Sequence, residues 1–396
     1  MSDQSTSKEP SSAAISWLRD LVRFQSLSGS ASNLDLLEMA DSALKLMGFS
    51  SRFTYSSDGR RANLFASIGG STGGLLLSGH TDVVPVAGQK WKYSPFELTE
   101  DSERLFGRGS CDMKGFIAAC MATLQRIDFN SLNAPLHIAL TYDEEIGCIG
   151  VRHLLDDLAK CGIRPSACIV GEPTNMQAVR SHKGRHAYRC RVLGQAAHSS
   201  LSGLGVNSLS YACELVGRIE EQASRLREME RDEGFYVPYS TMAPCRIEGG
   251  HANNVIPEET VLDFDLRFLP STDPERALGP VLEAAAGLAV QMQRRIPQAS
   301  IAIERRTGVP ALAADSSNDA VTVLALNAGA ELGPHVAYTT EGGLYQAAGI
   351  PAIVCGPGDI AQAHTADEYL LRSQLAACEH FLYRLIAQHP DAPNAK

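Results

Sequence analysis

Two histidines and five carboxylates in this chain have the side-chain chemistry of a two-metal site. Imidazole and carboxylate groups are ligands that divalent zinc accepts. Two such ions that share one carboxylate generate a hydroxide nucleophile at neutral pH. Five of the seven side chains would bind the ions, one carboxylate would transfer protons and another would orient a ligand. The set predicts an enzyme active site and consists of His80, Asp82, Asp112, Glu144, Glu145, Glu172 and His364.

The first two motifs are each open to a simpler interpretation. His80 and Asp82 lie two residues apart in HTD, so Asp82 can accept the N–H of His80 that a metal leaves free, although most such pairs are accidents. Asp112 lies in a glycine-flanked loop, where its carboxylate could bridge two ions or cap the helix that follows. Neither motif predicts a metal site by itself.

The later motifs are ambiguous in the same way. Glu144 and Glu145 are adjacent and follow Asp143, so their charges repel unless a cation or a proton compensates them. Without the other motifs this segment would be read as an acidic turn in water. Glu172 before Pro173 and the lone loop residue His364 would be read as ordinary surface groups. Only the combination predicts the site.

Composition limits the class of protein. The chain has 396 residues, of which 44% are hydrophobic, enough for a large core and two domains. The formal net charge of −10, without a Lys/Arg cluster, argues against nucleic acid or an anionic membrane as partner. No apolar stretch approaches the ~18 residues of a membrane span. The polar, Ser-rich residues 1–14 predict a disordered start without an export signal.

The ten cysteines are scattered and form no CxxC pair. Several of them lie in or beside apolar runs, which is typical of free thiols rather than of a disulfide framework. Cysteine usage therefore predicts a protein of the reducing cytoplasm.

The first part of the chain alternates strand and helix patterns, which predicts a largely parallel α/β sheet. Functional groups gather beyond the carboxyl ends of parallel strands, and His80, Glu144, Glu145 and Glu172 all fall there. Strands are expected at residues 75–77, 136–141 and 167–170, and helices at 15–24, 36–46 and 116–127.

The pattern changes between residues 185 and 306. The order becomes β-α-β-β-α-β, which is that of a ferredoxin-like domain. The α/β pattern resumes at residues 321–326 and 352–355, so this domain is inserted, and we expect catalytic parts at 1–184 and 307–396. The inserted elements are expected at residues 186–193, 206–226, 241–247, 261–268, 274–294 and 300–304.

The order and flanking residues of the motifs resemble a zinc-dependent deacetylase and exopeptidase family. This family includes acetylornithine deacetylase, succinyl-diaminopimelate desuccinylase, aminoacylase and carboxypeptidase-G-type enzymes. The resemblance covers nearly the whole chain. The matching segments are SGHTDVVP (78–85), GRGSCDMKG (107–115), TYDEEIG (141–147), GEPT (171–174), GQAAHSS (194–200), GGHANNVIP (249–257) and DEYL (367–370).

The resemblance implies a role for each metal-binding residue. His80, Asp112 and Glu172 would hold one zinc ion. Asp112, Glu145 and His364 would hold the other. Each subunit would thus bind two zinc ions, with cobalt able to substitute.

The same resemblance implies roles for the neighbouring side chains. Glu144 would be the general base, Asp82 would orient His80, and the Asp112–Met113 peptide bond would be cis. His198 would donate to the tetrahedral oxyanion from the partner subunit of a homodimer, which the inserted dimerisation and lid domain would form. The alternative for His198 is a purely local hydrogen bond with the serines that follow it.

Three further residues are candidates for substrate binding. The family resemblance implies that Arg267 and Asn254 clamp the substrate α-carboxylate, a task that suits the planar fork of arginine. By pattern alone, Arg267 would instead be a strand-face charge in a surface ion pair. Glu341 is a candidate partner for a substrate ammonium group.

Within the family, four segments are similar to the acetylornithine deacetylase subgroup. This similarity implies hydrolysis of N2-acetyl-L-ornithine to acetate and L-ornithine in arginine biosynthesis. Gly342-Gly343 stands where many of these enzymes carry Ala-Pro, and also matches the desuccinylase. Succinyl-diaminopimelate desuccinylase, N-acetylcitrulline deacetylase and a broader N-acyl-amino-acid hydrolase therefore stay open. The segments are RSHKG (180–184), GFYVPYSTM (234–242), YTTEGG (338–343) and CGPGDIAQAH (355–364).

A binding or scaffolding protein that keeps this fold without turnover is the alternative from another class. Such a protein should have lost Glu144 or a metal ligand. None of these residues is missing from the sequence. An enzyme is therefore the favoured prediction.

Overall fold

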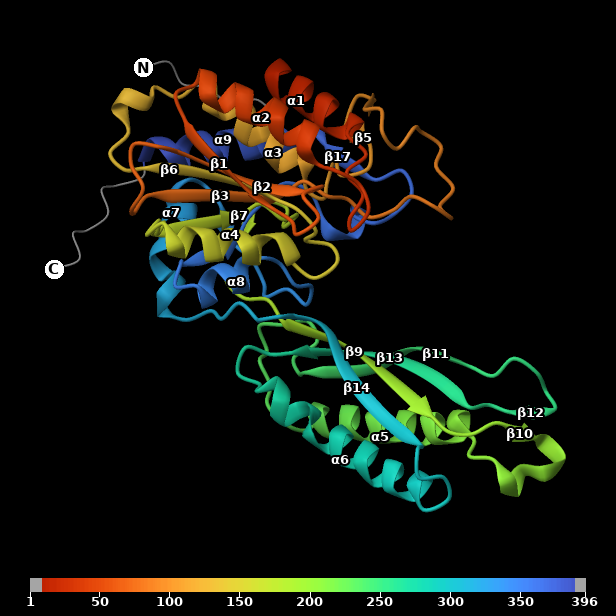
Figure 1. Ribbon diagram of the computed structural model, residues 1–396. Coiled ribbons are helices and arrows are strands. Elements are labelled where there is room, and N and C mark those ends of the chain that lie inside the picture. The colour runs from red at the N-terminus through yellow and green to blue at the C-terminus, as the bar shows by residue number, and fades with distance from the viewer. Residues whose placement is uncertain (1–8, 389–396) are drawn as a thin grey trace. The chain divides into compact units, whose positions relative to one another are not determined.

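The computed structural model describes residues 9–388 and divides into two compact units (Figure 1). The first unit contains the chain up to Ser181, Ala314–Pro334 and the chain from Thr340 onward. The second contains His182–Ala313 and His335–Thr339. Within the described residues, no helix has the length and apolar character that crossing a bilayer requires.

The first unit is built on a six-stranded sheet with the order β1-β2-β6-β3-β7-β16. The strands β6, β3, β7 and β16 run parallel, whereas β1 and β2 form an antiparallel hairpin at the edge. The predicted, largely parallel sheet is confirmed, and the edge hairpin is an addition. The bounds are β1 Ser50–Tyr55, β2 Ala62–Ile68, β3 Leu75–His80, β6 Leu136–Thr141, β7 Ala167–Val170 and β16 Ala352–Val354.

Helices cover both faces of this sheet (Figure 1). One face carries α1 (Ser12–Arg23), α2 (Leu34–Leu46), α3 (Lys114–Leu124) and α9 (Arg372–Gln388). The other face carries α4 (Ile149–Lys160) and α8 (Gly342–Ala347). Because both faces are covered, every residue of β3, β6 and β7 is buried.

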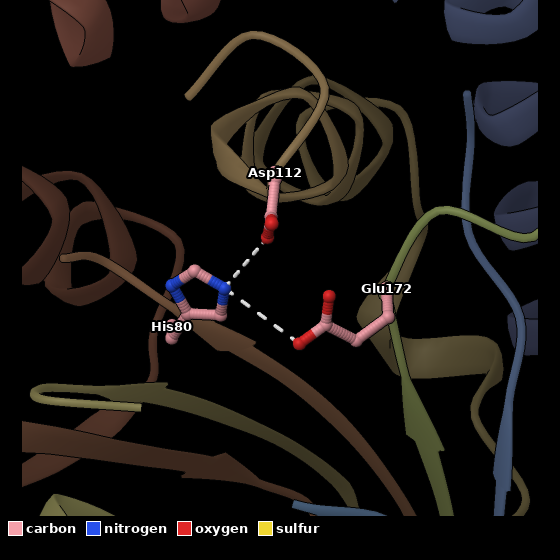
Figure 2. Close-up of side chains that lie close together, drawn as sticks. All are labelled: His80, Asp112 and Glu172. Carbon is pink, nitrogen blue, oxygen red and sulfur yellow. Dashed lines mark hydrogen bonds and ion pairs between the residues drawn. The ribbon is translucent and has the colours of Figure 1, made fainter. Parts of the chain in front are cut away.

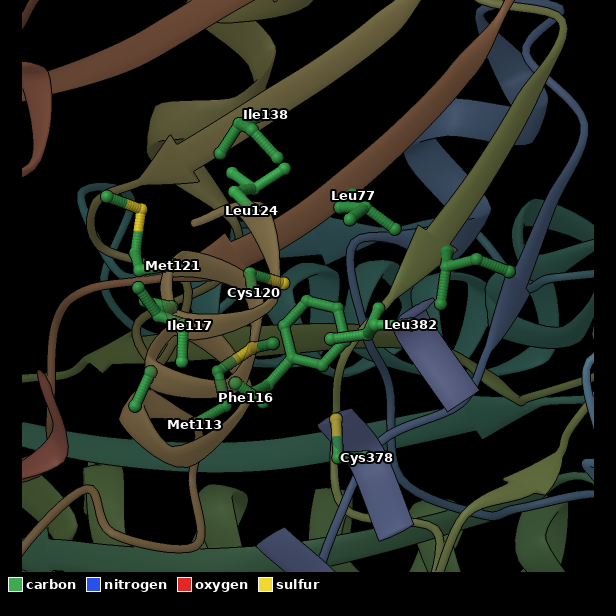
Figure 3. Close-up of a cluster of buried hydrophobic side chains, with 14 of the residues drawn as sticks. Leu77, Met113, Phe116, Ile117, Cys120, Met121, Leu124, Ile138, Cys378 and Leu382 are labelled. Carbon is green, nitrogen blue, oxygen red and sulfur yellow. The ribbon is translucent and has the colours of Figure 1, made fainter. Parts of the chain in front are cut away.

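The helix α3 is the centre of the main core. Its sequence KGFIAACMATL is apolar all round, and each of its residues is buried, so it packs against neighbours on every side. Figure 3 shows α3 side chains such as Phe116 and Cys120 among residues of the sheet and of α9, including Leu77 and Leu382. This packing fixes the position of the turn before α3, and that turn carries Asp112.

Short elements complete the first unit. They are α7 (Asp319–Asn327), the three-stranded sheet of β4 (Thr99–Glu100), β5 (Arg104–Phe106) and β17 (Tyr369–Leu371), the pair β8 (Gln177–Ala178) and β15 (Glu331–Leu332), and the 3-10 turns η1 (Phe129–Ser131), η3 (Ser316–Asn318) and η4 (Ile360–Gln362).

The second unit has the predicted order β-α-β-β-α-β. Its sheet is antiparallel throughout, with the order β11-β13-β9-β14, and α5 and α6 pack on it around a separate core. The alternating burial of β13 reflects one covered face. The bounds are β9 Gly184–Leu193, α5 Ser208–Arg227, β11 Thr241–Gly249, β13 Glu259–Phe268, α6 Pro274–Gln293 and β14 Ser300–Val309, with β10 (Ala197–His198), η2 (Ser199–Leu204) and β12 (Val255–Ile256) beside them.

Two local predictions differ from the structure. Strand β3 extends to His80 itself, because the strand continues to pair with β6 after its apolar run. Residues 1–8 of the predicted disordered start lie outside the described residues. The prediction is wrong for residues 12–14, which form the first turn of α1, because the Ser11 side chain caps that helix by accepting the N–H of Ala14. All ten cysteines are free, as predicted.

Candidate metal centre and active site

The five predicted metal ligands come from strand ends and from two loops of the first unit. His80 ends β3, Glu145 follows β6 and Glu172 follows β7. Because these strands are parallel, their carboxyl ends meet at one edge of the sheet. Asp112 lies in the turn before α3, and His364 lies in the loop after η4. The topology thus brings together residues that are far apart in sequence.

The five side chains form two groups that share Asp112. In the first group, His80 Nε2 lies 2.9 Å from Asp112 Oδ1 and 3.6 Å from Glu172 Oε1 (Figure 2). In the second, His364 Nε2 lies 3.1 Å from Asp112 Oδ2 and 3.0 Å from Glu145 Oε2. The donor atoms within each group all lie within 4.8 Å of one another. Asp112 therefore turns one oxygen toward each group, as a bridging ligand would.

The electrostatics of the cluster suit a cation. Burial raises the pKa of Glu172 well above its usual value and that of Glu145 to about 7, and the nearby Asp112 carboxylate adds to both shifts. Hydrogen bonds to Asp112 and Glu145 raise the pKa of His364 to about 10. The carboxylates can thus ionise together only with positive charge between them. One imidazole and two carboxylates in each group fit two divalent ions.

Glu144 has surroundings different from those of its neighbour Glu145. It belongs to neither ligand group, and it is 9% exposed. The thiol of Cys148 donates to its Oε1 at 3.3 Å. Burial raises the pKa of Glu144 well above the usual value, and the charge of Glu145 adds to the shift. A raised pKa makes this carboxylate a stronger base, which suits proton transfer.

Asp82 contacts its neighbours in a way that the motif did not predict. The Nδ1 of His80 lies 2.9 Å from the backbone oxygen of Asp82 and 3.7 Å from its carboxylate. The carboxylate instead accepts the backbone N–H groups of Glu144 at 3.1 Å and Glu145 at 3.3 Å, and the hydroxyl of Ser28 at 2.7 Å. Asp82 therefore fixes the backbone that carries the two adjacent glutamates.

The turn around Asp112 excludes the simpler interpretation of that residue. The helix α3 begins at Lys114 after Met113, without a side-chain cap, so Asp112 is not its cap. The Asp112–Met113 peptide bond is cis, as the family resemblance implies. The backbone N–H of Asp112 donates to Glu368 Oε1 at 3.1 Å. Glu368 is a residue that motif reasoning overlooked, although it lies in the DEYL segment.

Glu341 lies beside the ligand cluster but is only 1% exposed. Its Oε2 accepts the hydroxyl of Ser78 at 3.3 Å, whereas its Oε1 has no hydrogen-bond partner among the described residues. Burial raises the pKa of Glu341 to about 7. When ionised, this carboxylate would attract a cation through its charge.

His198 and Asn254 lie together in the second unit. The strand β10 pairs with β12, and the backbone oxygen of Asn254 accepts the N–H of Ser199 at 2.9 Å. The exposed His198 accepts the N–H of Ser200 on Nδ1 at 3.2 Å, so a neutral ring carries its proton on Nε2. The local hydrogen bond is thus present, and it leaves Nε2 as a donor.

Arg267 lies near the end of β13, and its contacts are those of a partly buried ion pair. Its Nε donates to Asp265 at 3.1 Å, and its Nη1 donates to the backbone oxygen of Ala337 at 3.3 Å. The side chain is 34% exposed. The guanidinium therefore has a fixed position and still reaches solvent.

Comparison with known proteins identifies relatives of the whole chain. The model of peptidase family M20/M25/M40 matches residues 76–388. An acetylornithine deacetylase of Shigella sonnei (strain Ss046) is 37% identical over 340 residues, which are 86% of each protein.

Solved structures share the fold. The M20 family metallo-carboxypeptidase Sso-CP2 of Sulfolobus solfataricus has a TM-score of 0.77 at 19% identity, over 95% of this chain and 99% of that one. A dinuclear metal binding peptidase of the M20 family from Bacillus subtilis has a TM-score of 0.65 at 15% identity, over 94% of this chain and 96% of that one. At these identities the likeness concerns the fold.

Proposed function

The chain belongs to peptidase family M20/M25/M40, and we propose that it is an amidohydrolase that removes the acetyl group from N2-acetyl-L-ornithine. The observation that carries this proposal is the convergence of two three-ligand groups on the shared Asp112, with Glu144 beside them. The substrate is suggested by the similar deacetylase of Shigella sonnei.

We propose zinc for both groups, with cobalt able to substitute. His80, Asp112 and Glu172 would hold one ion, and Asp112, Glu145 and His364 the other. Bound ions of this kind polarise a carbonyl group and lower the pKa of water. The mixed imidazole and carboxylate donors support zinc over the all-oxygen sites that calcium and magnesium prefer.

Glu144 would move the proton of the reaction. Its carboxylate would accept a proton from the attacking water and deliver it to the amine that leaves. The raised pKa supports this role, because a carboxyl group that titrates closer to neutrality can carry out both transfers. The thiol of Cys148 holds Oε1 and leaves Oε2 for the proton.

Arg267 and Glu341 would recognise the two charged ends of the substrate. The fork of Arg267 can bind a carboxylate with two N–H groups. Because Glu341 is buried, we propose that it attracts the side-chain ammonium through its charge rather than through direct contact.

The geometry of the second unit supports a homodimer formed by residues 185–306. His198 and Asn254 lie beside β12, just before β13 begins, whereas Arg267 lies near the other end of β13. At a rise of about 3.3 Å per residue, the eight steps from Glu259 to Arg267 span about 26 Å. One acetylated amino acid cannot span that distance. If His198 and Asn254 act with Arg267 on one substrate, they must come from the partner subunit.

A desuccinylase is the second candidate, and Gly342-Gly343 favours it. The two glycines open α8 directly after Glu341, so a change there alters the boundary of the proposed ammonium site. The test is a panel of acetylornithine, acetylcitrulline, acetylmethionine and succinyl-diaminopimelate at matched concentrations with zinc or cobalt. We expect acetylornithine to give the highest kcat/KM. A tenfold preference for succinyl-diaminopimelate would overturn the proposal.

A further inference from the structure

Glu368 is a buried carboxylate that binds no ion in either ligand group, yet it contacts the turn that carries the shared ligand. Its Oε1 accepts the backbone N–H groups of Cys111 at 3.0 Å and Asp112 at 3.1 Å. Its Oε2 accepts Nη1 of Arg108 at 2.7 Å. Glu368 and Arg108 are each 1% exposed. A buried ion pair therefore anchors the backbone of the bridging aspartate.

The same arginine continues the chain of contacts to the second metal group. Arg108 Nη2 donates to Gln89 Oε1 at 2.5 Å, and Trp91 Nε1 donates to the same oxygen at 3.1 Å. The amide Nε2 of Gln89 then donates to the backbone oxygen of His364 at 2.7 Å. His364 has a positive φ of 61°, a backbone conformation that a non-glycine residue holds only with support.

The loop that carries Gln89 is tied to the loop that carries Glu368. Asp367 Oδ1 accepts the backbone N–H groups of Lys92 at 2.8 Å and Tyr93 at 3.2 Å. Asp367 thus holds the segment that follows Gln89, and the adjacent Glu368 holds the turn of Asp112. The side chains of Glu368, Arg108 and Gln89 therefore connect the turn of Asp112 with the loop of His364 and fix the separation between them.

We propose that Glu368, Arg108 and Gln89 form a positioning relay that holds Asp112 and His364 at the separation that one metal ion requires. The proposal rests on the proposed function, because it concerns the same centre. These residues touch no donor atom of either group, so they act only through the backbones of the ligands. Outer residues that orient metal ligands typically change metal affinity 10–100-fold when they are removed.

The relay predicts a different effect at each end. His364 is the one metal ligand that Gln89 contacts, and Arg108 keeps its ion pair with Glu368 when Gln89 is removed. Gln89→Ala should therefore weaken the ion bound by Asp112, Glu145 and His364 by about 10–100-fold and change the other ion much less. Glu368 holds the shared Asp112, so Glu368→Gln should weaken both ions. A merely structural role would lower the stability of the metal-free protein without this selectivity.

The experiment is a zinc titration of chelator-treated full-length protein against a chromophoric chelator, with thermal unfolding of the metal-free protein measured in parallel. Gln293→Ala is the matched control, because its amide also donates to a backbone oxygen, that of Ala299 at 3.1 Å, but in the second unit. We expect two zinc ions and wild-type affinity for this control.

Selective loss of one ion in Gln89→Ala, at an unchanged midpoint for the metal-free protein, would support the relay. Wild-type affinity for both ions in Gln89→Ala would overturn it, whether or not Glu368→Gln folds. If the wild-type protein itself bound no zinc, the proposed function would fail together with the relay. If the wild type and Gln89→Ala bound two ions with the same affinities, the relay alone would be overturned.

Discussion

Glu144 and Glu145 are adjacent, yet their carboxylates meet different partners. Glu145 lies 3.0 Å from the imidazole of His364, whereas Glu144 receives the thiol of Cys148 and belongs to neither ligand group. The Asp82 carboxylate accepts both of their backbone N–H groups and so fixes the direction in which each side chain leaves the backbone. At the residue scale, the proposed roles of metal binding and proton transfer therefore fall to two side chains that are one peptide bond apart.

This separation can be tested with two isosteric variants. Glu144→Gln should keep both metals but lose kcat by about 10²–10⁴-fold, because it removes proton transfer and no ligand. Glu145→Gln should instead lower the occupancy of one metal. Metal analysis and steady-state kinetics on both proteins provide the measurement. Equal metal loss in the two variants would contradict the assignment.

At the scale of elements, α3 determines the shape of the segment that carries Glu172. A Cβ atom at Gly171 would overlap the ring of Phe116, which projects from α3. Both residues are buried, and Phe116 belongs to the hydrophobic core of the first unit. The glycine before Glu172 is thus required by the close approach of a helix to the end of β7.

Gly171→Ala should lower the free energy of unfolding by about 1–3 kcal/mol, as overpacked cores do. It should also weaken zinc binding, because the displaced backbone carries Glu172. Chemical denaturation and zinc titration measure the two effects. Combining it with Phe116→Leu should cost less than the sum of the single changes, because the ring that causes the overlap is gone.

Gly217→Ala in α5 is the matched control for this prediction. Its Cβ would have no atom within 4 Å, and alanine is the better helix former, so stability should stay the same or rise by up to about 1 kcal/mol. A loss in Gly217→Ala as large as that in Gly171→Ala would refute the packing explanation.

The ends of β3, β6 and β7 should also be stabilised by metal. Each ion at 100 times its dissociation constant stabilises a folded protein by about 2.7 kcal/mol, so two ions contribute about 5.4 kcal/mol. Since 1 kcal/mol corresponds to about 2–4 °C in a domain of 150–250 residues, EDTA should lower Tm by about 11–22 °C. Differential scanning calorimetry checks this. His364→Ala should show a smaller shift, and an unchanged wild-type Tm would argue against a metal centre.

At the scale of the whole molecule, the two ends of β13 carry different parts of the proposed machinery. Arg267 lies at one end, while His198 and Asn254 lie beside the other. In a dimer, Arg267 would bind the substrate of its own subunit. His198 and Asn254 would act on the substrate of the partner subunit. The proposed homodimer would therefore serve the chemistry and not only stability.

Mixing inactive subunits tests this arrangement. Glu144→Gln and His198→Ala proteins should each be inactive, and a mixture should recover activity after subunit exchange. Half of the randomly formed dimers are hybrids, and each hybrid has one intact site, so about a quarter of wild-type activity should return. No recovery after exchange verified by mass spectrometry would show that His198 does not act across the dimer.

The sequence alone determined the alternation of elements, the inserted β-α-β-β-α-β order and the choice of candidate ligands. These features are local, because apolar periodicity and residue type are readable within a short window. Three of the five ligands, His80, Glu145 and Glu172, end or follow strands whose patterns are strong, and the structure brings all five ligands together. The hairpin of β1 and β2 was not predicted, because its pairing in the sheet depends on the neighbouring β6.

Only the tertiary structure decided how the ligands are held. The carboxylate of Asp82 accepts hydrogen bonds from the backbone of Glu144 and Glu145, and only its backbone oxygen is hydrogen-bonded to His80. Glu368 contacts the turn of Asp112 across more than 250 residues of sequence. A carboxylate can accept hydrogen bonds from any backbone N–H group that folding brings near it, so its partner is not encoded in its neighbours. Long-range packing therefore chose these contacts, and with them the geometry of the centre.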